Sequence, residues 1–185
     1  TIYKKRNAEL WVEYGAGKVT KDELNKQRFY YPLQSVGVED RELANQLLKD
    51  FFAIIPTKSG LMPYAAELLD YLSPKYNLYI LSNGFRELQT KKLNSGGVDH
   101  YFKKVILSDD LGVLKPNPAL FNFALSATQS ELRESLMIGD SWDADIVGAN
   151  SVGMHQAFYN VNGKTELPFK PTYLIKELKE LEGIL

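Results

Sequence analysis

Residues 135–145 read SLMIGDSWDAD, an apolar stretch that ends in glycine and passes directly into acidic and hydroxyl residues. The run from Ser135 to Ile138 has the length and apolar character of a buried strand, and a helical pattern begins at Ala144. Asp140 would then lie at the carboxyl end of a strand, with Asp145 in the first turns of the next helix. Ligands of open α/β sheets bind at that end of the strands, so this stretch predicts both a fold and a site.

The same alternation of strand and helix continues on both sides of this stretch. We predict strands over residues 77–81, 104–107, 135–138, 155–159 and 172–175, separated by helices over 63–72, 85–94, 117–127, 144–151 and 176–181. Strands spaced by helices of this length need right-handed crossovers, which arrange them in a parallel sheet. Residues 58–185 are therefore expected to form a doubly wound α/β domain.

Residues 1–57 contain no candidate strand. Three helices are expected, over residues 3–14, 20–30 and 40–55. The second should begin at a capping box, in which Thr20 is the N-cap and Glu23 reaches back to it. Pro32 is expected to stop this helix, because proline lacks the N–H group that a helix interior needs. The sequence thus predicts an all-helical domain over residues 1–57.

Charge and composition narrow the classes of partner and cofactor. The 185 residues carry 22 Lys and Arg against 23 Asp and Glu, which gives a net charge of −1. Binding to nucleic acid or to a membrane surface therefore has no electrostatic support, and no apolar run is long enough to span a bilayer. With no Cys and only two His, the chain could hold a metal only as a hard cation with oxygen ligands. We expect a cytoplasmic protein that is monomeric or a weak homodimer.

Two loops offer groups that suit a phosphate. Ser82, Asn83 and Gly84 follow a predicted strand and open a helix, so a hydroxyl and backbone N–H groups could form an anion cradle there. The same three residues are also common in ordinary turns. Lys115 precedes Pro116 and a helix start, and a lysine held in that way is a point charge suited to a phosphoryl group. The alternative is a solvated loop lysine.

A third loop offers carboxylates. Asp140 and Asp145 converge at a strand end, where they could form an Mg²⁺ site that also uses waters and substrate oxygens. Alternatively, Ser141 or Asp143 caps the helix and the remaining acids are surface charges. A cap accounts for one of these acids, but it does not account for Asp140 at the edge of a sheet.

Three strings carry a family resemblance: LSNG at 81–84, LKPNP at 114–118 and GDSWDAD at 139–145. In sequence and in order they resemble motifs II, III and IV of the haloacid dehalogenase (HAD) superfamily, most of whose members are phosphatases. Residues 148–154 resemble the segment that often follows motif IV, and the helices of residues 1–55 resemble the C1 cap of HAD subfamily I. The chain is identified as a member of that subfamily.

The resemblance implies a HAD-like doubly wound, Rossmann-like sheet with a helical cap. It also implies an Mg²⁺-dependent phosphohydrolase that works through an aspartyl-phosphate on a small phosphorylated metabolite, a nucleotide or pyrophosphate. Ser82 would donate to the transferring phosphoryl group, with the backbone N–H groups of Asn83 and Gly84 beside it. Lys115 would neutralise charge on that group.

For the metal, the resemblance implies that Asp140 is a direct Mg²⁺ ligand. Asp145 would support waters on the metal or orient Lys115. Ser82, Lys115 and Asp140 would thus be the catalytic residues. The alternatives are a 2-haloacid dehalogenase, a phosphomutase, or a HAD-like binding module that has lost catalysis. Dehalogenases replace the motif IV metal ligand by a non-acidic residue, so the acidic Asp140 favours phosphate hydrolysis.

Motif I of the family, an Asp-x-Asp string that carries the nucleophile, is not found upstream of these motifs. The string Asp143-Ala144-Asp145 has that form but belongs to motif IV. Because the chain starts at Thr1 and residues 2–14 have the pattern of a helix interior, we expect the functional protein to carry an upstream segment with motif I. That segment would supply the central strand, between the strands that end near Ser82 and Asp140. Without it the chain is not expected to turn over.

Substrate contacts are expected from the helical domain and from the helix after Gly84. The candidates are polar and aromatic residues that a closing cap could present: Glu9, Trp11, Glu13, Phe85 and Arg86, with Tyr14, Lys18 and Arg28 as further possibilities. A cap of this kind sets specificity and excludes water. Each residue could instead serve packing or lie on a solvated face.

Overall fold

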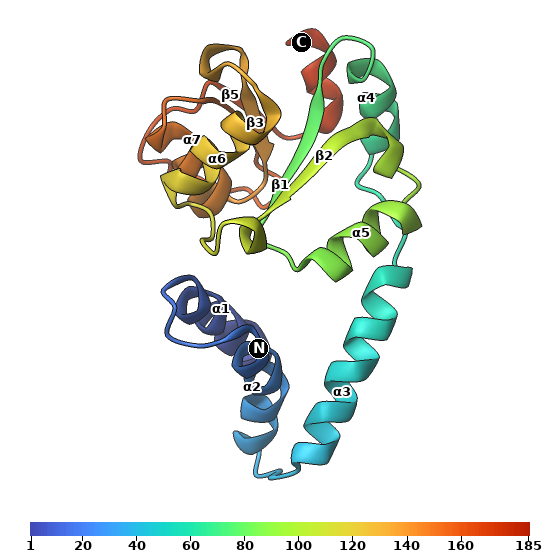
Figure 1. The fold of residues 1–185 in the computed structure, drawn as a ribbon, viewed down its shortest axis with the longest axis vertical. Coiled ribbons are helices and arrows are strands. Elements are labelled where there is room, and N and C mark those ends of the chain that lie inside the picture. The colour runs from blue at the N-terminus through green and yellow to red at the C-terminus, as the bar shows by residue number, and fades with distance from the viewer. The chain divides into compact units, whose positions relative to one another are not determined.

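The computed structural model describes all residues from Thr1 to Leu185. The chain divides into two compact units, Thr1–Lys58 and Ser59–Leu185, and each is described by itself. The first unit is helical, and the second combines helices with strands (Figure 1). No helix combines the length and the hydrophobicity that crossing a bilayer requires.

The first unit consists of α1 (Ile2–Gly15), α2 (Lys21–Gln34) and α3 (Arg41–Ile54), followed by a 3-10 turn at Ile55–Thr57. Leu10 and Leu24 are fully buried between the helices. The capping box is present, since Glu23 N–H donates to Thr20 Oγ at 3.2 Å and Thr20 N–H donates to the Glu23 carboxylate at 2.7 Å. The bond from the Thr20 backbone lowers the pKa of Glu23.

The prediction that Pro32 stops α2 is wrong. The helix continues through Pro32 to Gln34. A proline this close to a helix end removes only one backbone hydrogen bond. The chain beyond it stays helical because Ser35 N–H donates to the Tyr31 carbonyl at 3.0 Å and Ser35 Oγ donates to the Pro32 carbonyl at 2.7 Å.

The second unit contains five parallel strands in two sheets. The strands are β1 (Leu78–Ser82), β2 (Phe102–Leu107), β3 (Leu136–Gly139), β4 (His155–Tyr159) and β5 (Tyr173–Ile175). One sheet has the order β1-β2 and the other β3-β4-β5, so β1 and β3 each pair on one side only. The expected parallel α/β architecture is confirmed, and it comes as two sheets.

The helices of this unit are α4 (Ala65–Leu72), α5 (Arg86–Ser95), α6 (Pro118–Thr128) and α7 (Val147–Ser151). Short 3-10 turns lie at Asp99–Tyr101, Ser108–Asp110 and Leu132–Glu134. Two expected helices differ in kind. The helix expected from Ala144 starts two residues earlier, as a π-helical turn over Trp142–Ile146, and the expected closing helix is a 3-10 turn over Leu178–Gly183.

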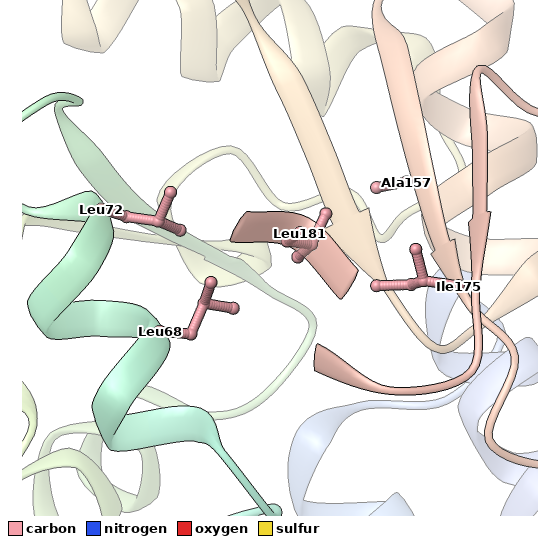
Figure 2. Close-up of a cluster of buried hydrophobic side chains, with 5 residues drawn as sticks. All are labelled: Leu68, Leu72, Ala157, Ile175 and Leu181. Atoms are coloured by element: carbon pink, nitrogen blue, oxygen red, sulfur yellow. The ribbon is translucent and has the colours of Figure 1, made fainter. Parts of the chain in front are cut away.

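One core cluster joins distant segments of the second unit. Figure 2 shows Leu68 and Leu72 from α4, Ala157 from β4, Ile175 from β5 and Leu181 from the closing turn. These five side chains are between 0% and 5% exposed. Each leucine or isoleucine buried in this way contributes roughly 1.5–3 kcal/mol. The cluster fixes α4 and the C-terminal turn against β4 and β5.

Alternate residues of β3 face opposite sides of the sheet, and each side is covered by helices. Leu136 and Ile138 pack against the cluster of Figure 2, which contains α4. Met137 packs against the other cluster, which contains Phe121 of α6 and Ala149 of α7. Helices on both faces make this a doubly wound arrangement.

A glycine brings α6 and α7 close together. A Cβ atom at Gly148 would lie 2.3 Å from Phe121 Cε2 and 3.1 Å from Pro116 Cα, so only glycine fits. This contact holds the loop before α6, which carries Lys115, against the segment that follows Asp145. The packing of the two helices thereby positions two predicted site residues.

Candidate active site

The site is built where three parallel strands end. In the β1–β2 pair, Ser82 is in register with Leu107, so the two strands end side by side. The loop after Leu107 leads to Lys115, and β3 ends at Gly139. The carboxyl ends of parallel strands are where α/β proteins bind ligands. Ser82, Lys115 and Asp140 therefore lie at strand ends or in the loops that follow strands.

Lys115 links the ends of β1 and β3. Its ammonium donates to the Leu81 carbonyl at 2.7 Å and to Asp145 Oδ1 at 2.6 Å. The side chains of Lys115 and Asp145 are only 10% and 8% exposed, so the ion pair is buried. An ammonium has three N–H donors, and two are used within the chain. One donor remains for a ligand at the same position.

Asp145 is held in place by its backbone neighbours. Its Oδ2 accepts a hydrogen bond from Ser141 N–H at 3.1 Å, while Ser141 Oγ caps the π-helical turn by accepting from Ala144 N–H at 3.2 Å. The carboxylate packs directly onto the end of β3, because a Cβ atom at Gly139 would lie 2.4 Å from Asp145 Oδ2. The contact between Asp145 and Lys115 is the one that its expected role in orienting Lys115 would need.

Asn83 clamps the backbone of Lys115. Lys115 N–H donates to Asn83 Oδ1 at 2.7 Å, and Asn83 Nδ2 donates to the Lys115 carbonyl at 3.0 Å. The amide thus imitates the paired hydrogen bonds of neighbouring strands. The sequence had suggested only a role for the Asn83 backbone in phosphate binding. Its side chain instead joins the loop after β1 to the loop that carries Lys115.

Replacing Asn83 by alanine should loosen this clamp. In the complete natural protein we expect kcat/KM on phosphate esters to fall about tenfold to 100-fold and the free energy of unfolding to fall by about 1–3 kcal/mol, because two half-buried hydrogen bonds to the Lys115 backbone are lost. Steady-state kinetics and thermal unfolding check both effects. Asn122, an exposed asparagine of α6, gives the matched control when it is changed to alanine. Full activity in the Asn83 variant would contradict the clamp.

Ser82 and Gly84 form a compact turn at the end of β1. Ser82 Oγ accepts hydrogen bonds from Gly84 N–H at 3.0 Å and from Gln89 Nε2 at 2.6 Å. Gln89 was not among the sequence-based candidates. The signal available was its position one turn into the helix that follows the Ser-Asn-Gly string. Ser82 itself is half-buried, as a residue that meets a ligand at a strand end would be.

Asp140 differs from Asp145 in its surroundings. It is exposed, and it takes part in none of the hydrogen bonds that hold Asp145. No group of three or more His, Cys, Asp or Glu residues is arranged to enclose a metal. One accessible carboxylate suits a hard cation such as Mg²⁺, which keeps several waters and takes ligand oxygens. The donors present therefore fit a hydrated Mg²⁺ held by Asp140 and do not fit a closed protein cage.

Phe85 and Arg86, proposed as substrate contacts, have structural partners. Phe85 is 2% exposed and lies in the core. Arg86 forms an ion pair with Asp110, whose other carboxylate oxygen accepts from Leu107 N–H at 2.9 Å. Arg86 thus ties the start of α5 to the end of β2. Asp110 was also missed, although its position just after a strand could have drawn attention to it.

Four candidates of the helical unit have partners within that unit. Glu9 and Glu13 both accept from Arg6, at 3.3 and 2.8 Å, and the bond to Glu13 raises the pKa of Arg6. Trp11 and Tyr14 meet edge to face, with ring centroids 5.9 Å apart. Within Thr1–Lys58, these side chains therefore connect turns of α1 with one another.

Arg28 and Lys18, also from this unit, differ in burial. Arg28 is 5% exposed and donates to the Tyr3 hydroxyl at 3.1 Å. Its guanidinium carbon lies 4.7 Å from the centroid of the Phe51 ring, so the buried side chain of Arg28 packs against that ring. Lys18 lies exposed in the turn between α1 and α2.

Comparison with known proteins points to one family. A family model described as haloacid dehalogenase-like hydrolase matches residues 4–153. The HAD-hydrolase YfnB of Bacillus subtilis (strain 168) is 34% identical over 186 residues, which cover 99% of this chain and 78% of YfnB. A crystal structure of YfnB bound to magnesium superposes with a TM-score of 0.89 at 32% identity, over 98% of this chain and 79% of that one.

Two further relatives carry a named activity. The pyrimidine 5'-nucleotidase YjjG of Escherichia coli (strain K12) is 31% identical over 99% of this chain and 80% of its own length. The pyrimidine 5'-nucleotidase PynA of Streptococcus pneumoniae (strain ATCC BAA-255 / R6) is 30% identical over 97% of this chain and 76% of its own length.

Proposed function

The chain belongs to the haloacid dehalogenase-like hydrolase family, and we propose that it is an Mg²⁺-dependent phosphatase of nucleoside 5'-monophosphates, pyrimidine nucleotides first among them. The observation that carries the proposal is the buried ammonium of Lys115, held between the Leu81 carbonyl and Asp145 with one donor left over. Two relatives that this chain matches over 80% and 76% of their own length are pyrimidine 5'-nucleotidases, which supports the choice of substrate.

The chain's own groups would bind the transferring phosphoryl group. Ser82 donates its hydroxyl to one phosphoryl oxygen, and Lys115 donates its remaining N–H to another. Fixed donors of this kind stabilise charge that develops in the transition state. Asp140 would hold Mg²⁺, which when bound offsets the repulsion between carboxylates and the phosphate. The binding of YfnB to magnesium supports this choice of metal.

The nucleophile is proposed to be an aspartate on a further strand. The free edges of β1 and β3 carry backbone groups that need partners, and nothing in Thr1–Leu185 pairs with them. A strand between them would end beside Ser82 and Lys115. Its carboxylate would attack phosphorus, the bond from phosphorus to the leaving oxygen would break, and a nearby acid would protonate that oxygen. Water would then hydrolyse the aspartyl-phosphate, releasing phosphate and restoring the carboxylate.

Phosphate release by the complete natural protein tests the proposal. We expect release from p-nitrophenyl phosphate and from UMP, CMP and dTMP, faster than from AMP, GMP or a sugar phosphate, and lost with EDTA until Mg²⁺ is restored. Chloride release from 2-chloropropionate, assayed in parallel, should be absent. A protein that releases chloride and no phosphate would be a dehalogenase, and one that releases neither would contradict the proposed function.

A further inference from the structure

The hydrogen bonds around Ser82 determine which way its hydroxyl proton points. Ser82 Oγ accepts from Gly84 N–H at 3.0 Å and from Gln89 Nε2 at 2.6 Å. A serine hydroxyl has two acceptor lone pairs and one donated proton. Both lone pairs are therefore occupied from within the chain. The proton is left to point away from these two donors, and an anionic oxygen is a suitable acceptor for it.

Gln89 reaches Ser82 because residue 84 is glycine. A Cβ atom at Gly84 would lie 2.2 Å from Gln89 Nε2 and 2.9 Å from Gln89 Cδ. The side chain of Gln89 thus occupies the space above Gly84. The glycine contributes twice, by leaving room for the amide and by donating its own N–H. Gln89 stands on α5, whose first turn begins at Arg86, so a regular helix holds its position.

We propose that Gln89 is a positioning residue that keeps the hydroxyl proton of Ser82 directed toward the phosphoryl group. By donating to Ser82 Oγ, the amide prevents the hydroxyl from turning its proton back into the chain. This inference rests on the proposed phosphatase function, since it assigns the direction of one hydrogen bond at the same site. The residue acts on substrate only through Ser82.

The polarity of this bond can be reversed by substitution. Gln89→Glu keeps the shape of the side chain but offers only acceptors when ionised. Ser82 would then donate to the new carboxylate and lose its donor to the phosphoryl group. Gln89→Met keeps the length of the side chain and removes the bond, which leaves the hydroxyl free to rotate. The two variants therefore differ in how strongly they should impair Ser82.

Kinetics of the complete natural protein on p-nitrophenyl phosphate measure this difference. We expect kcat to fall about 100-fold in Gln89→Glu, as for Ser82→Ala, because the donor is lost. Gln89→Met should cost about tenfold, the effect of one hydrogen bond. In a Ser82→Ala background neither change should cost anything further. Thr90→Glu, which adds the same charge at the exposed neighbouring position of α5, should leave kcat unchanged.

Three kinetic results would overturn the proposal. Wild-type activity in Gln89→Glu would mean that the amide accepts from Ser82. Equal losses with and without the Ser82 hydroxyl would mean that Gln89 serves packing or that its new charge repels the substrate directly. A fall in the melting temperature of Gln89→Met as large as that of a core substitution would likewise mean that Gln89 serves packing.

A second readout does not depend on turnover. In ¹H–¹⁵N spectra, one Gln89 side-chain amide proton should be shifted downfield by its bond to Ser82 and should lose that shift in Ser82→Ala. An amide resonance unaffected by Ser82→Ala would overturn the inference even if the protein hydrolyses no phosphate ester. If the protein is inactive but the Gln89 resonance is shifted, the hydrogen bond to Ser82 is present and only the proposed phosphatase function is wrong.

Discussion

Replacing Lys115 by methionine in the complete natural protein should lower the kcat of phosphate ester hydrolysis by about 10²–10³-fold and destabilise the fold by about 3–5 kcal/mol. The kinetic loss follows from removing the ammonium that would meet the phosphoryl group. The loss of stability follows because Asp145, at 8% exposure, would keep a buried carboxylate without its partner. Steady-state kinetics and urea unfolding measure the two effects separately.

A double variant separates the two contributions of Lys115. Lys115→Met combined with Asp145→Leu removes both charges together, so it should recover much of the lost stability while activity stays lost. Lys91→Met, on the exposed face of α5, is the matched control for removing a lysine and should change neither quantity. A single Lys115 variant that is both stable and active would contradict the buried pair as well as its role in catalysis.

Asp140→Asn is expected to lower Mg²⁺-dependent turnover by about 10²–10³-fold without changing stability. The asparagine keeps the size of the side chain but loses the charge that would hold the cation. Because Asp140 is exposed, removing its charge leaves no buried group without a partner. Magnesium titrations of activity should show a raised requirement for the metal, and the melting temperature should be that of the wild type.

Asp143 provides the control for Asp140, since it is an exposed aspartate three residues further along the same loop. Asp143→Asn should retain its activity and its requirement for Mg²⁺. Unchanged turnover in Asp140→Asn would remove Asp140 from the metal site. Equal losses in both variants would indicate a general effect of negative charge in this loop.

The family and the parallel α/β fold were predictable from the sequence because they follow from local signals. Apolar runs of strand length end at Ser82 and just before Asp140, and helical segments of crossover length separate them. The expected role of Asp145 in orienting Lys115 agrees with the 2.6 Å contact between their side chains. Spacing places such residues on one edge, since all parallel strands end on the same side.

Side-chain partners were less predictable because they depend on packing between distant segments. The clamp of Asn83 on Lys115 joins residues 32 positions apart, and no periodicity signals it. The pairing of Arg86 with Asp110 likewise joins residues 24 positions apart, and no sequence pattern indicated it. The prediction that Pro32 stops α2 was wrong because a proline near a helix end costs too little free energy to stop the helix.

We expect Ser82, Lys115 and Asp140 to bind one phosphate and one cation at the same strand ends. A crystal structure of the complete natural protein grown with Mg²⁺ and inorganic phosphate tests it most directly. We expect phosphate oxygens within about 3 Å of Ser82 Oγ and Lys115 Nζ, and an Mg²⁺ ion bound by Asp140. Phosphate bound elsewhere, or Asp140 turned away from both the cation and Lys115, would contradict it.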